Sequence, residues 1–418
     1  MISNGKTCQS MKVLVIAYAC EPGRGSELGT GWHMSLGLAK KVDLTVVTRA
    51  NNKEKIEADL DGRLGPKPKF VYVDPASWAI RLKRSGILPV QIFYQFWQVA
   101  VAKAVKNLEC HFDIIHQMTF NSFEVPPLSF WVLKGAKVWG PVGGGQRVPW
   151  KLLAGFGFKA GAVEFIRNIR VFCSSWNPLC RGAIKRSDLL LFANNETRDL
   201  LGVSHDATTD LMIDVGVDLE KFSEGSGSES SSGMIFLFAG RLEGRKGVLL
   251  LVRAFKKHAL CYEHTELRIV GNGPLAERVK REVEGMQCAS RISLVGLVSH
   301  TEIAEEFDRA DVFLFPSLRD TSGTAVLEAM SVGLPVICFD HQGAAVMVSD
   351  ECGVKVGVES MKQSICDLAG AMNAMADSTL EDRLAMGRAG RRRVAGEFDW
   401  ESKVRKISGY YEKALSTK

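Results

Sequence analysis

The sequence predicts an α/β fold made of two doubly wound halves, each with a parallel sheet. Three observations predict it. The chain has 418 residues, which is long for a single hydrophobic core. Apolar, β-branched runs alternate with helix-like patterns, and several of these runs end in glycine. The alternation restarts after Ser223, so a second strand–turn–helix series follows the first.

The first half opens with a strand, a glycine-rich turn, a helix and a second strand. Residues 11–18 form the apolar run MKVLVIAY, which breaks at EPGRGSELGTGW. HMSLGLAKK then predicts a helix, and DLTVVTR predicts the next strand of a parallel βαβ unit. Further strands are predicted at DIIHQM, residues 113–118, and at AKVWGPVGGG. SDLLLFANNETRDLL predicts a strand and a helix that Asn194 or Asn195 caps.

The second half repeats this succession with different residues. MIFLFAG predicts a strand, RLEGRKG a turn and VLLLVRAFKKH a helix, and later strands are predicted at ELRIVGNG, RISLVGLV, DVFLFPS and LPVICFD. The low-complexity run SEGSGSESSSG, residues 223–233, predicts a flexible loop. An amphipathic C-terminal helix is expected to pack back on the first domain. The predicted divisions are a disordered tail 1–10, a first domain 11–205, a second domain 206–393 and the C-terminal helix 394–418.

Composition argues against several classes of protein. The apolar fraction of 46 % and the charged fraction of 24 % are those of a soluble globular protein. No apolar run is long enough for a transmembrane helix, and MISNGKTCQS lacks the apolar core of a secretory signal. Ten cysteines without a CxxC pair predict a reduced, cytosolic setting. The net charge of +6 suits anionic partners, but without a zinc or RNA-binding signature it does not predict nucleic-acid binding.

The turn GRLEGRKG places Arg241 and Lys246 between a predicted strand and a predicted helix. Amides at a helix N-terminus attract anions, arginine binds them bidentately, and lysine adds a compact charge. The turn therefore suits a diphosphate group. A solvated basic turn is the alternative interpretation.

The stretch FPSLRDTSGTAVLEAM, Phe315 to Met330, places Asp320 and Glu328 eight residues apart. Gly323 between them lets a loop backbone approach a ligand closely. A carboxylate accepts hydrogen bonds from two adjacent hydroxyls, as on a ribose or a hexose. The alternative is a capped helix whose glutamate is solvated.

Three further features are weaker. His116 ends the strand DIIHQM, where it is either a ligand contact or a structural histidine. From Gly25 the first turn follows GxxxGxG instead of GxGxxG, so a dinucleotide site is poorly supported. Asp59 and Asp61 form a DxD pattern within a charged segment, which we interpret as a solvated helix end, and no metal is expected.

In their order along the chain, these motifs resemble the retaining glycosyltransferases of family 4, among the glycosyl transferases group 1. That resemblance implies the GT-B fold, with two facing Rossmann-like domains and a cleft between them. It covers Met11 to about Leu415 and is strongest from Ile213 to Gly353. It rests on IDVGVDLEKF, FAGRLEGRKG, LRIVGNGPL, ISLVGLVS, DVFLFPSLRDTSGTAVLEAMSVGLPVI and VSDECGV, with DIIHQMTF and VWGPVGGG in the first half.

The resemblance implies roles for the charged residues. Arg241 and Lys246 correspond to the cations that hold the donor diphosphate. Glu328 corresponds to the carboxylate that binds the donor ribose, and Asp320 to the acid that contacts the transferred sugar. With His116, which corresponds to the histidine near the reacting end of the sugar, Arg241, Lys246 and Asp320 form the predicted catalytic set.

The resemblance also implies contacts to the donor from uncharged residues. Gly323 and Thr324 correspond to the loop that faces the sugar and the phosphate. Gly29 corresponds to the glycine of the first turn that closes over the phosphates, and Val298 to a contact with the base. No cofactor and no metal ion are implied.

The sequence departs from the family pattern in three places. Asp320 stands where glutamate is usual, Thr321-Ser322-Gly323 replaces a Gly-Phe-Gly-like loop, and Asp214-Val215 replaces Pro-Asn before GVD. These departures leave open which sugar is bound.

The implied reaction moves a sugar from a UDP- or GDP-linked donor to a hydroxyl of a glycan, glycolipid or lipid-linked acceptor, with retention. Residues 81–106 and 147–170 mix basic and aromatic side chains, so they suit either peripheral contact with an anionic membrane or a core-packed helix with a basic outer face. A cytoplasmic location at the inner face of the membrane is expected. The alternatives are a nucleotide-sugar epimerase or hydrolase, a phosphorylase, or a non-catalytic nucleotide-sugar-binding partner of another transferase.

Overall fold

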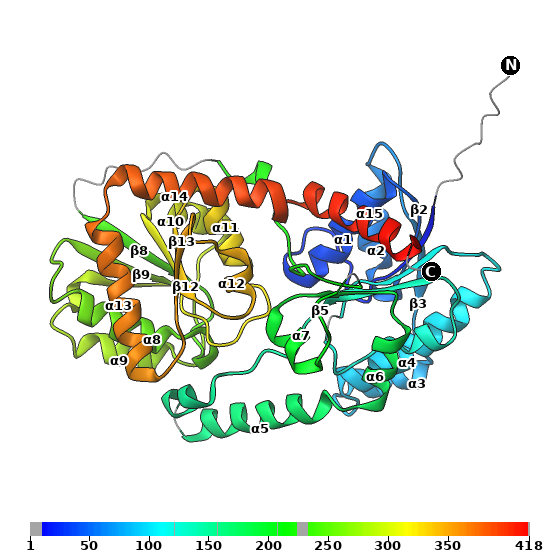
Figure 1. Ribbon diagram of the computed structural model, residues 1–418, viewed down its shortest axis with the longest axis horizontal. Helices are drawn as coiled ribbons and strands as arrows, with labels where there is room; N and C mark the ends of the chain where they lie inside the picture. Colours follow the sequence, from blue (N-terminus) through cyan, green and yellow to red (C-terminus); the bar gives the residue numbers. More distant parts are fainter. Residues whose placement is uncertain (1–10, 121, 157, 207, 224–232, 417–418) are drawn as a thin grey trace, which may run out of the picture. The chain divides into compact units, whose positions relative to one another are not determined.

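A computed structural model of the chain describes residues 11–120, 122–156, 158–206, 208–223 and 233–416 (Figure 1). The predicted tail 1–10 and all but the two ends of the predicted loop 223–233 lie outside the described residues. The chain divides into two compact units. Unit 1 comprises Met1–Gly145, Cys173–Val215 and Trp400–Lys418, and unit 2 comprises Gln146–Phe172 and Gly216–Asp399.

Within the described residues, the sheet of unit 1 has seven parallel strands in the order β3-β2-β1-β4-β5-β6-β7. They are β1 (Lys12–Ile16), β2 (Asp43–Arg49), β3 (Lys69–Val73), β4 (Ile114–Gln117), β5 (Ala136–Val142), β6 (Leu189–Phe192) and β7 (Thr209–Leu211). The strand order reverses between β1 and β4, which pair directly through Val15 and His116. In sheets of this kind, ligands bind at the carboxyl ends of the two strands that flank the reversal.

The helices of unit 1 are α1 (Ser26–Ala39), α2 (Lys53–Asp61), α3 (Ser77–Arg84), α4 (Val90–Lys106), α6 (Pro178–Arg186), α7 (Asn195–Leu201) and α15 (Trp400–Ser416). Asn194 caps α7, as predicted, because its side chain accepts a hydrogen bond from the Thr197 amide at 3.0 Å. The C-terminal helix α15 packs on α1, where a side-chain carbon at Gly37 would lie 2.3 Å from Val404. The buried Lys403 of α15 donates a hydrogen bond to the carbonyl of Ile213.

Helix α1 begins seven residues before the segment predicted as helical. The prediction assigned the glycines of EPGRGSELGTGW to a turn, whereas Gly29 and Gly31 lie inside the helix. Both face carbonyl groups of the preceding loop. A side-chain carbon would lie 2.2 Å from the Arg24 oxygen at Gly29 and 2.0 Å from the Ala19 oxygen at Gly31. These glycines therefore permit close packing of the helix and do not interrupt it.

The sheet of unit 2 has six parallel strands in the order β10-β9-β8-β11-β12-β13, all within the described residues. They are β8 (Met234–Ala239), β9 (Thr265–Val270), β10 (Ile292–Gly296), β11 (Val312–Phe315), β12 (Val336–Phe339) and β13 (Gly353–Val356). The order reverses between β8 and β11, which are hydrogen-bonded neighbours. Two parallel, doubly wound sheets confirm the predicted fold class.

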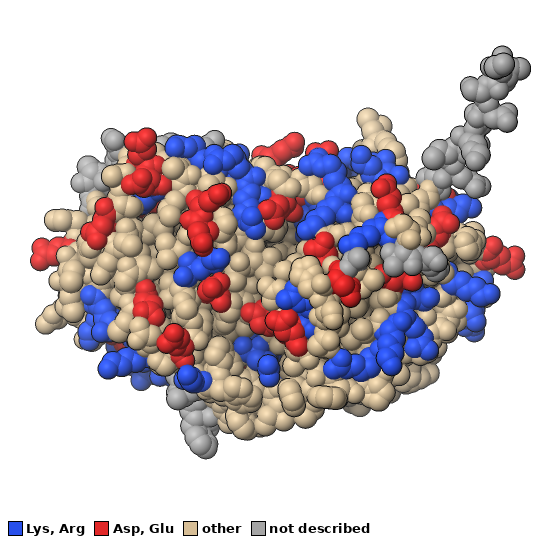
Figure 2. Space-filling view, viewed as in Figure 1, with Lys and Arg blue, Asp and Glu red and all other residues tan. Residues whose placement is uncertain are grey.

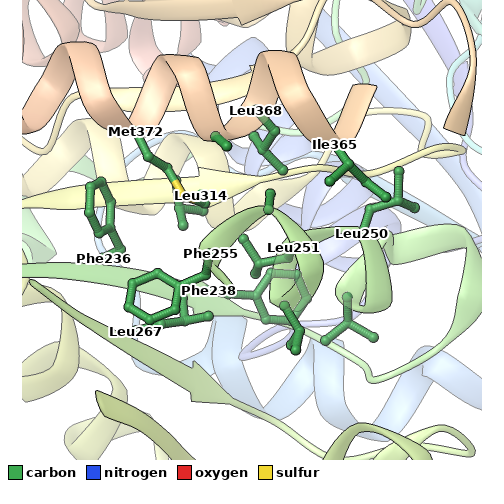
Figure 3. Close-up of a cluster of buried hydrophobic side chains, with 14 of the residues drawn as sticks. Phe236, Phe238, Leu250, Leu251, Phe255, Leu267, Leu314, Ile365, Leu368 and Met372 are labelled. Atoms are coloured by element: carbon green, nitrogen blue, oxygen red, sulfur yellow. The ribbon is translucent and has the colours of Figure 1, made fainter. Parts of the chain in front are cut away.

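The helices that belong wholly to unit 2 are α8 (Val248–His258), α9 (Ala276–Glu284), α10 (His300–Arg309), α11 (Thr324–Val332), α12 (Gln342–Met347), α13 (Met361–Asp377) and α14 (Leu380–Arg393). Helices α8 and α13 cover one face of the sheet and close its main core (Figure 3). Phe236, Phe238 and Phe255 fill the centre of this core, and Leu368 and Met372 reach it from α13. This burial fixes β8, whose carboxyl end leads into the basic turn.

One segment departs from the order of the chain. The predicted first domain runs from 11 to 205, whereas the structure assigns residues 146–172, with most of α5 (Phe158–Ser174), to unit 2. Val148 and Leu152 are buried in the core of unit 2, and the Phe156 ring lies so close to Gly244 that a side-chain carbon there would be 2.6 Å away. The other divisions fall at 215/216 and 399/400, where 205/206 and 393/394 were predicted.

Candidate functional site

A pocket of about 380 Å³ opens in unit 2 at the carboxyl ends of β8, β9 and β10. Arg241, Val298 and Glu328, three of the predicted donor-binding residues, all line it. They come from three separate parts of the chain. Arg241 follows β8, Val298 follows β10, and Glu328 lies in α11, which follows β11. The pocket thus lies beside the reversal of the strand order, where a parallel sheet binds its ligands.

The floor of the pocket is backbone at two glycines. Gly271 has φ +128°, and a side-chain carbon there would lie 2.0 Å from the Gly240 oxygen. The amide of Gly240 donates to the Val270 oxygen at 3.0 Å, and that of Gly271 to the Gly296 oxygen at 2.7 Å. The ends of β8, β9 and β10 therefore meet closely, and no side chain of these glycines reduces the space for a ligand.

A second cluster lies on the turn that follows Arg241. The Lys246 ammonium donates a hydrogen bond to the Asp320 carboxylate, and about five-sixths of each side chain is buried. Arg245 lies 3.9 Å from the same carboxylate oxygen. Since β8 and β11 are neighbouring parallel strands, the loops that follow them meet at one edge of the sheet, and residues 74 positions apart come into contact.

Arg245 was not selected from the sequence, although it precedes Lys246 in the same turn. Its side chain pairs with Glu243 as well as lying near Asp320, and it donates to the Arg319 oxygen at 3.3 Å. The turn therefore carries two cations beside the Asp320 carboxylate. The run RKG was the available sign in the sequence, but it could not show that both of its cations lie beside Asp320.

Gln342 holds the Asp320 loop, and no motif of the sequence marks it. It is 3 % exposed and has φ +59°, a conformation that glutamine rarely adopts. Its side-chain oxygen accepts from the Asp320 amide at 2.7 Å, and its side-chain nitrogen donates to the Arg147 oxygen at 3.1 Å. Gln146 adds a hydrogen bond to the Thr321 hydroxyl. The segment that begins at Gln146 therefore supports the loop through hydrogen bonds.

Gly323 and Thr324 lie where this loop enters α11. Gly323 has φ +80° and is the residue before the helix, and Thr324 is the first residue of the helix. A side-chain carbon at Gly323 would lie 2.6 Å from the Phe315 ring. Any larger residue would therefore displace the loop that carries Asp320.

His116 lies at the end of β4, in the interior of unit 1. It is fully buried, with Nδ1 2.8 Å from the Tyr411 hydroxyl and Nε2 2.7 Å from the Gly140 carbonyl oxygen. The neutral ring donates from Nε2 to the carbonyl and accepts from tyrosine at Nδ1. Both nitrogens are thus occupied within the fold, and the predicted contact of His116 with a donor sugar stays a prediction.

The burial of His116 has a consequence for stability. Desolvation lowers the pKa of His116 from 6.5 to about 4. Because the unfolded state takes up a proton at a higher pH than the folded state, the stabilisation is complete above pH 6.5. It is lost as the pH falls towards 4, by about 3 kcal/mol in total. Unfolding experiments across this range should show that His116→Gln has a shallower pH dependence than the parent, whereas His111→Gln, on an exposed histidine, keeps the parental slope.

The remaining predicted features lie elsewhere. Gly29 is the fourth residue of α1, next to Thr30, whose hydroxyl donates to the Asp214 carbonyl at 2.8 Å. Asp59 forms an ion pair with Arg63 near the end of α2. Among the described residues, no group of three or more His, Cys, Asp or Glu side chains is arranged to hold a metal ion.

The two segments predicted to suit a membrane surface both display apolar side chains. Residues 81–106 form the second half of α3 and all of α4, where Ile92 and Val99 are at least half exposed. Residues 147–170 form most of α5 and the 3-10 turn before it, and Trp150 is half exposed. No helix in the described part of the chain combines the length and the hydropathy needed to cross a bilayer.

Comparison with known proteins bears on the fold of the chain and on the family that residues 222–393 resemble. Residues 222–393 match the family model of the glycosyl transferases group 1. The amylovoran biosynthesis glycosyltransferase AmsK of Erwinia amylovora is 28 % identical over 46 % of this chain and 53 % of its own length. A GDP-mannose-dependent phosphatidylinositol monomannoside mannosyltransferase of Mycobacterium tuberculosis is 26 % identical over 64 % of this chain and 74 % of its own. The chain thus spans about half the length of AmsK.

Solved structures match nearly the whole chain. A sucrose-phosphate synthase from Thermosynechococcus elongatus superposes with a TM-score of 0.64, at 17 % identity, over 98 % of this chain and 100 % of its own. Anabaena HepE in complex with UDP superposes with a TM-score of 0.60, at 16 % identity, over 96 % of this chain and 100 % of its own. The chain therefore has the GT-B fold, and its residues 222–393 match the family model of the glycosyl transferases group 1.

Proposed function

We propose that unit 2 binds a nucleoside diphosphate sugar and that the chain transfers the sugar to an acceptor hydroxyl with retention, as in glycosyltransferase family 4. One observation carries the proposal. Arg241, Val298 and Glu328 converge on a single pocket beside the strand reversal, and the turn that begins at Arg241 ends at the Lys246–Asp320 pair. In the proposed complex, the base lies against Val298, and Glu328 accepts hydrogen bonds from the ribose hydroxyls.

In the proposed reaction, the basic turn stabilises the leaving group. When the bond between the anomeric carbon and the diphosphate oxygen breaks, negative charge develops on the leaving group. Arg241, Arg245 and Lys246 stabilise this charge from a preorganised turn. A phosphate competes with Asp320 for Lys246, and this competition frees the carboxylate to accept a hydrogen bond from a hydroxyl of the transferred sugar.

No residue of the described site is an evident general base for the acceptor. In the proposed reaction, the acceptor oxygen bonds to the anomeric carbon on the face that the diphosphate leaves. The acceptor proton passes to the departing phosphate oxygen, so the products are the glycoside and the nucleoside diphosphate. The proposal requires neither a metal ion nor a cofactor.

The named relatives suggest the donor and the acceptor. Anabaena HepE is in complex with UDP, and the mycobacterial relative is described as GDP-mannose-dependent, which supports a UDP- or GDP-linked donor. AmsK is named for amylovoran biosynthesis, and the mannosyltransferase for a phosphatidylinositol mannoside, which supports a glycan or lipid-linked acceptor. We place the reaction in the cytoplasm at the inner face of the membrane.

A thermal-shift panel tests the donor site. We expect one nucleotide family among UDP, GDP, ADP and their common sugar conjugates to raise the Tm, and NAD to have no effect. A ligand at about 100 times its Kd stabilises the fold by roughly 2.7 kcal/mol, which shifts the Tm by a few degrees. Glu328→Ala should lose the shift, whereas Glu284→Ala, an exposed glutamate of α9, should keep it.

Two results would contradict the proposal. A folded sample that responds to no nucleotide would remove the donor site. Donor consumption that proceeds at the same rate without any acceptor would indicate a hydrolase or epimerase instead of a transferase.

A further inference from the structure

Helix α5 buries polar side chains and exposes apolar ones, which is unusual for a surface helix. Its inward face carries polar side chains beside the buried Val171, with Glu164 8 % exposed and Asn168 fully buried. Its outward face is apolar at five positions. Their exposed fractions are 66 % for Val163, 47 % for Phe165, 66 % for Ile166, 43 % for Ile169 and 49 % for Phe172. A surface helix normally packs such an apolar face against the core. An apolar face that is exposed instead is typical of a surface that binds a partner or a membrane.

Polar contacts fix the orientation of the helix. The Glu164 carboxylate accepts two hydrogen bonds from the Arg319 guanidinium, at 2.8 and 3.1 Å. Asn168 donates to the Val148 oxygen at 2.8 Å, and Arg167 donates to the Gln146 oxygen at 2.9 Å. Rolling the helix to bury its apolar face would break these contacts and leave a charged pair unmatched. The apolar face is therefore held outward.

The sequence around this face is basic. Residues 147–173 contain five lysines and arginines and a single acidic residue, Glu164, which points inward to Arg319. Trp150 is half exposed, and its ring packs edge-on against that of Phe165, with 5.3 Å between the ring centroids. In the view of Figure 2, the lower rim, where Figure 1 shows α5, is mainly tan. Apolar side chains, a tryptophan and flanking cations together are typical of a helix that lies in a membrane interface.

We propose that the outward face of α5, extended by Trp150, enters the headgroup region of an anionic lipid bilayer. The apolar side chains then leave water, and Lys151 and Arg170, which are exposed, meet the lipid phosphates. This contact would bring the protein to a lipid-linked acceptor, which lies in the same bilayer. In that respect it rests on the proposed function. Arg319, the inward partner of the helix, directly precedes Asp320, so the segment that contacts lipid also supports the loop of the proposed sugar site.

Vesicle sedimentation tests the surface without any nucleotide or acceptor. The full chain should sediment with vesicles of phosphatidylcholine and phosphatidylglycerol in equal amounts, and less with phosphatidylcholine alone. The double variant Ile166→Asp/Ile169→Asp should reduce the partition coefficient at least about tenfold. Leu260→Asp makes the same kind of change at a residue of unit 2 that is 73 % exposed and lies outside α5, and it should bind as the parent does. Equal binding by the double variant would overturn the proposal.

Hydrogen exchange locates the contact. In the presence of the same anionic vesicles, amide exchange in peptides that cover residues 158–172 should slow, and unchanged exchange there would exclude α5 as the bilayer contact. If the chain instead forms a dimer that Ile166→Asp/Ile169→Asp dissociates, and vesicles are not bound, the apolar face belongs to a protein interface and the proposal is wrong. None of these outcomes depends on donor binding, so failure of the nucleotide panel and failure of the membrane contact are separate results.

Discussion

Lys246→Ala should lower the rate of sugar transfer by at least about 10²-fold, because removal of a preorganised group that stabilises a transition-state charge commonly costs that much. In the free protein, Lys246 is bound to Asp320, and both are largely buried. In the proposed complex, the ammonium turns to the diphosphate as charge develops on it. The loss should therefore appear in kcat as well as in KM, measured by release of the nucleoside diphosphate with the donor that the thermal-shift panel identifies.

Lys257→Ala is the matched control, because Lys257 is an exposed lysine of the neighbouring helix α8. It should leave the rate unchanged. Circular dichroism and the Tm of both variants establish that each is folded. Near-normal turnover by folded Lys246→Ala would remove Lys246 from the chemical step, and the phosphate role would then fall to Arg241 and Arg245.

Gly387→Ala should destabilise unit 2 strongly. Gly387 lies in α14, and a side-chain carbon there would lie 1.8 Å from the backbone oxygen of Gly333, the residue that ends α11. The atoms that the new side chain would meet belong to the backbone, so no flexible side chain can move aside. The two helices must therefore separate. Overpacking of this kind costs about 3 kcal/mol, which should lower the Tm by roughly 6 to 12 °C for a unit of this size.

Gly370→Ala provides a control of opposite sign. Gly370 lies in the middle of α13, and nothing is within 4 Å of the position that a side-chain carbon would occupy. Alanine there should stabilise the helix by about 0.5 to 1 kcal/mol. If Gly387→Ala raised the Tm as Gly370→Ala does, the close approach of α14 and α11 would not exist in solution. Because α11 carries Glu328, Gly387→Ala should also weaken nucleotide binding.

The three residues of the predicted donor site that line one pocket share a simple property. Arg241 and Val298 lie in loops that follow parallel strands, and Glu328 lies in the helix after such a loop. All these loops meet at one edge of the sheet. The order of elements is therefore enough to bring them together. The same rule predicts the meeting of the turn that ends at Lys246 with the loop of Asp320.

Other parts of the site depend on contacts that no local pattern encodes. Gln342 supports the Asp320 loop through a strained backbone and three side-chain hydrogen bonds, but a single glutamine after a strand has no distinguishing pattern. The burial of His116 depends on Tyr411, 295 positions away. The glycines of α1 resembled a turn because the sequence does not show that Gly29 and Gly31 face carbonyl groups. In each case a distant packing partner decides the outcome.

The excursion of residues 146–172 also bears on how this protein can be divided or recombined. The chain crosses between the two units at 145/146, 172/173, 215/216 and 399/400. Neither unit is one continuous stretch of polypeptide. A fragment that stops before Trp400 lacks the tyrosine that binds His116, and a fragment that starts at Gly216 lacks the buried Val148 and Leu152. An exchange of unit 2 between two such proteins must therefore carry residues 146–172 along with residues 216–399 and leave the final helix with unit 1.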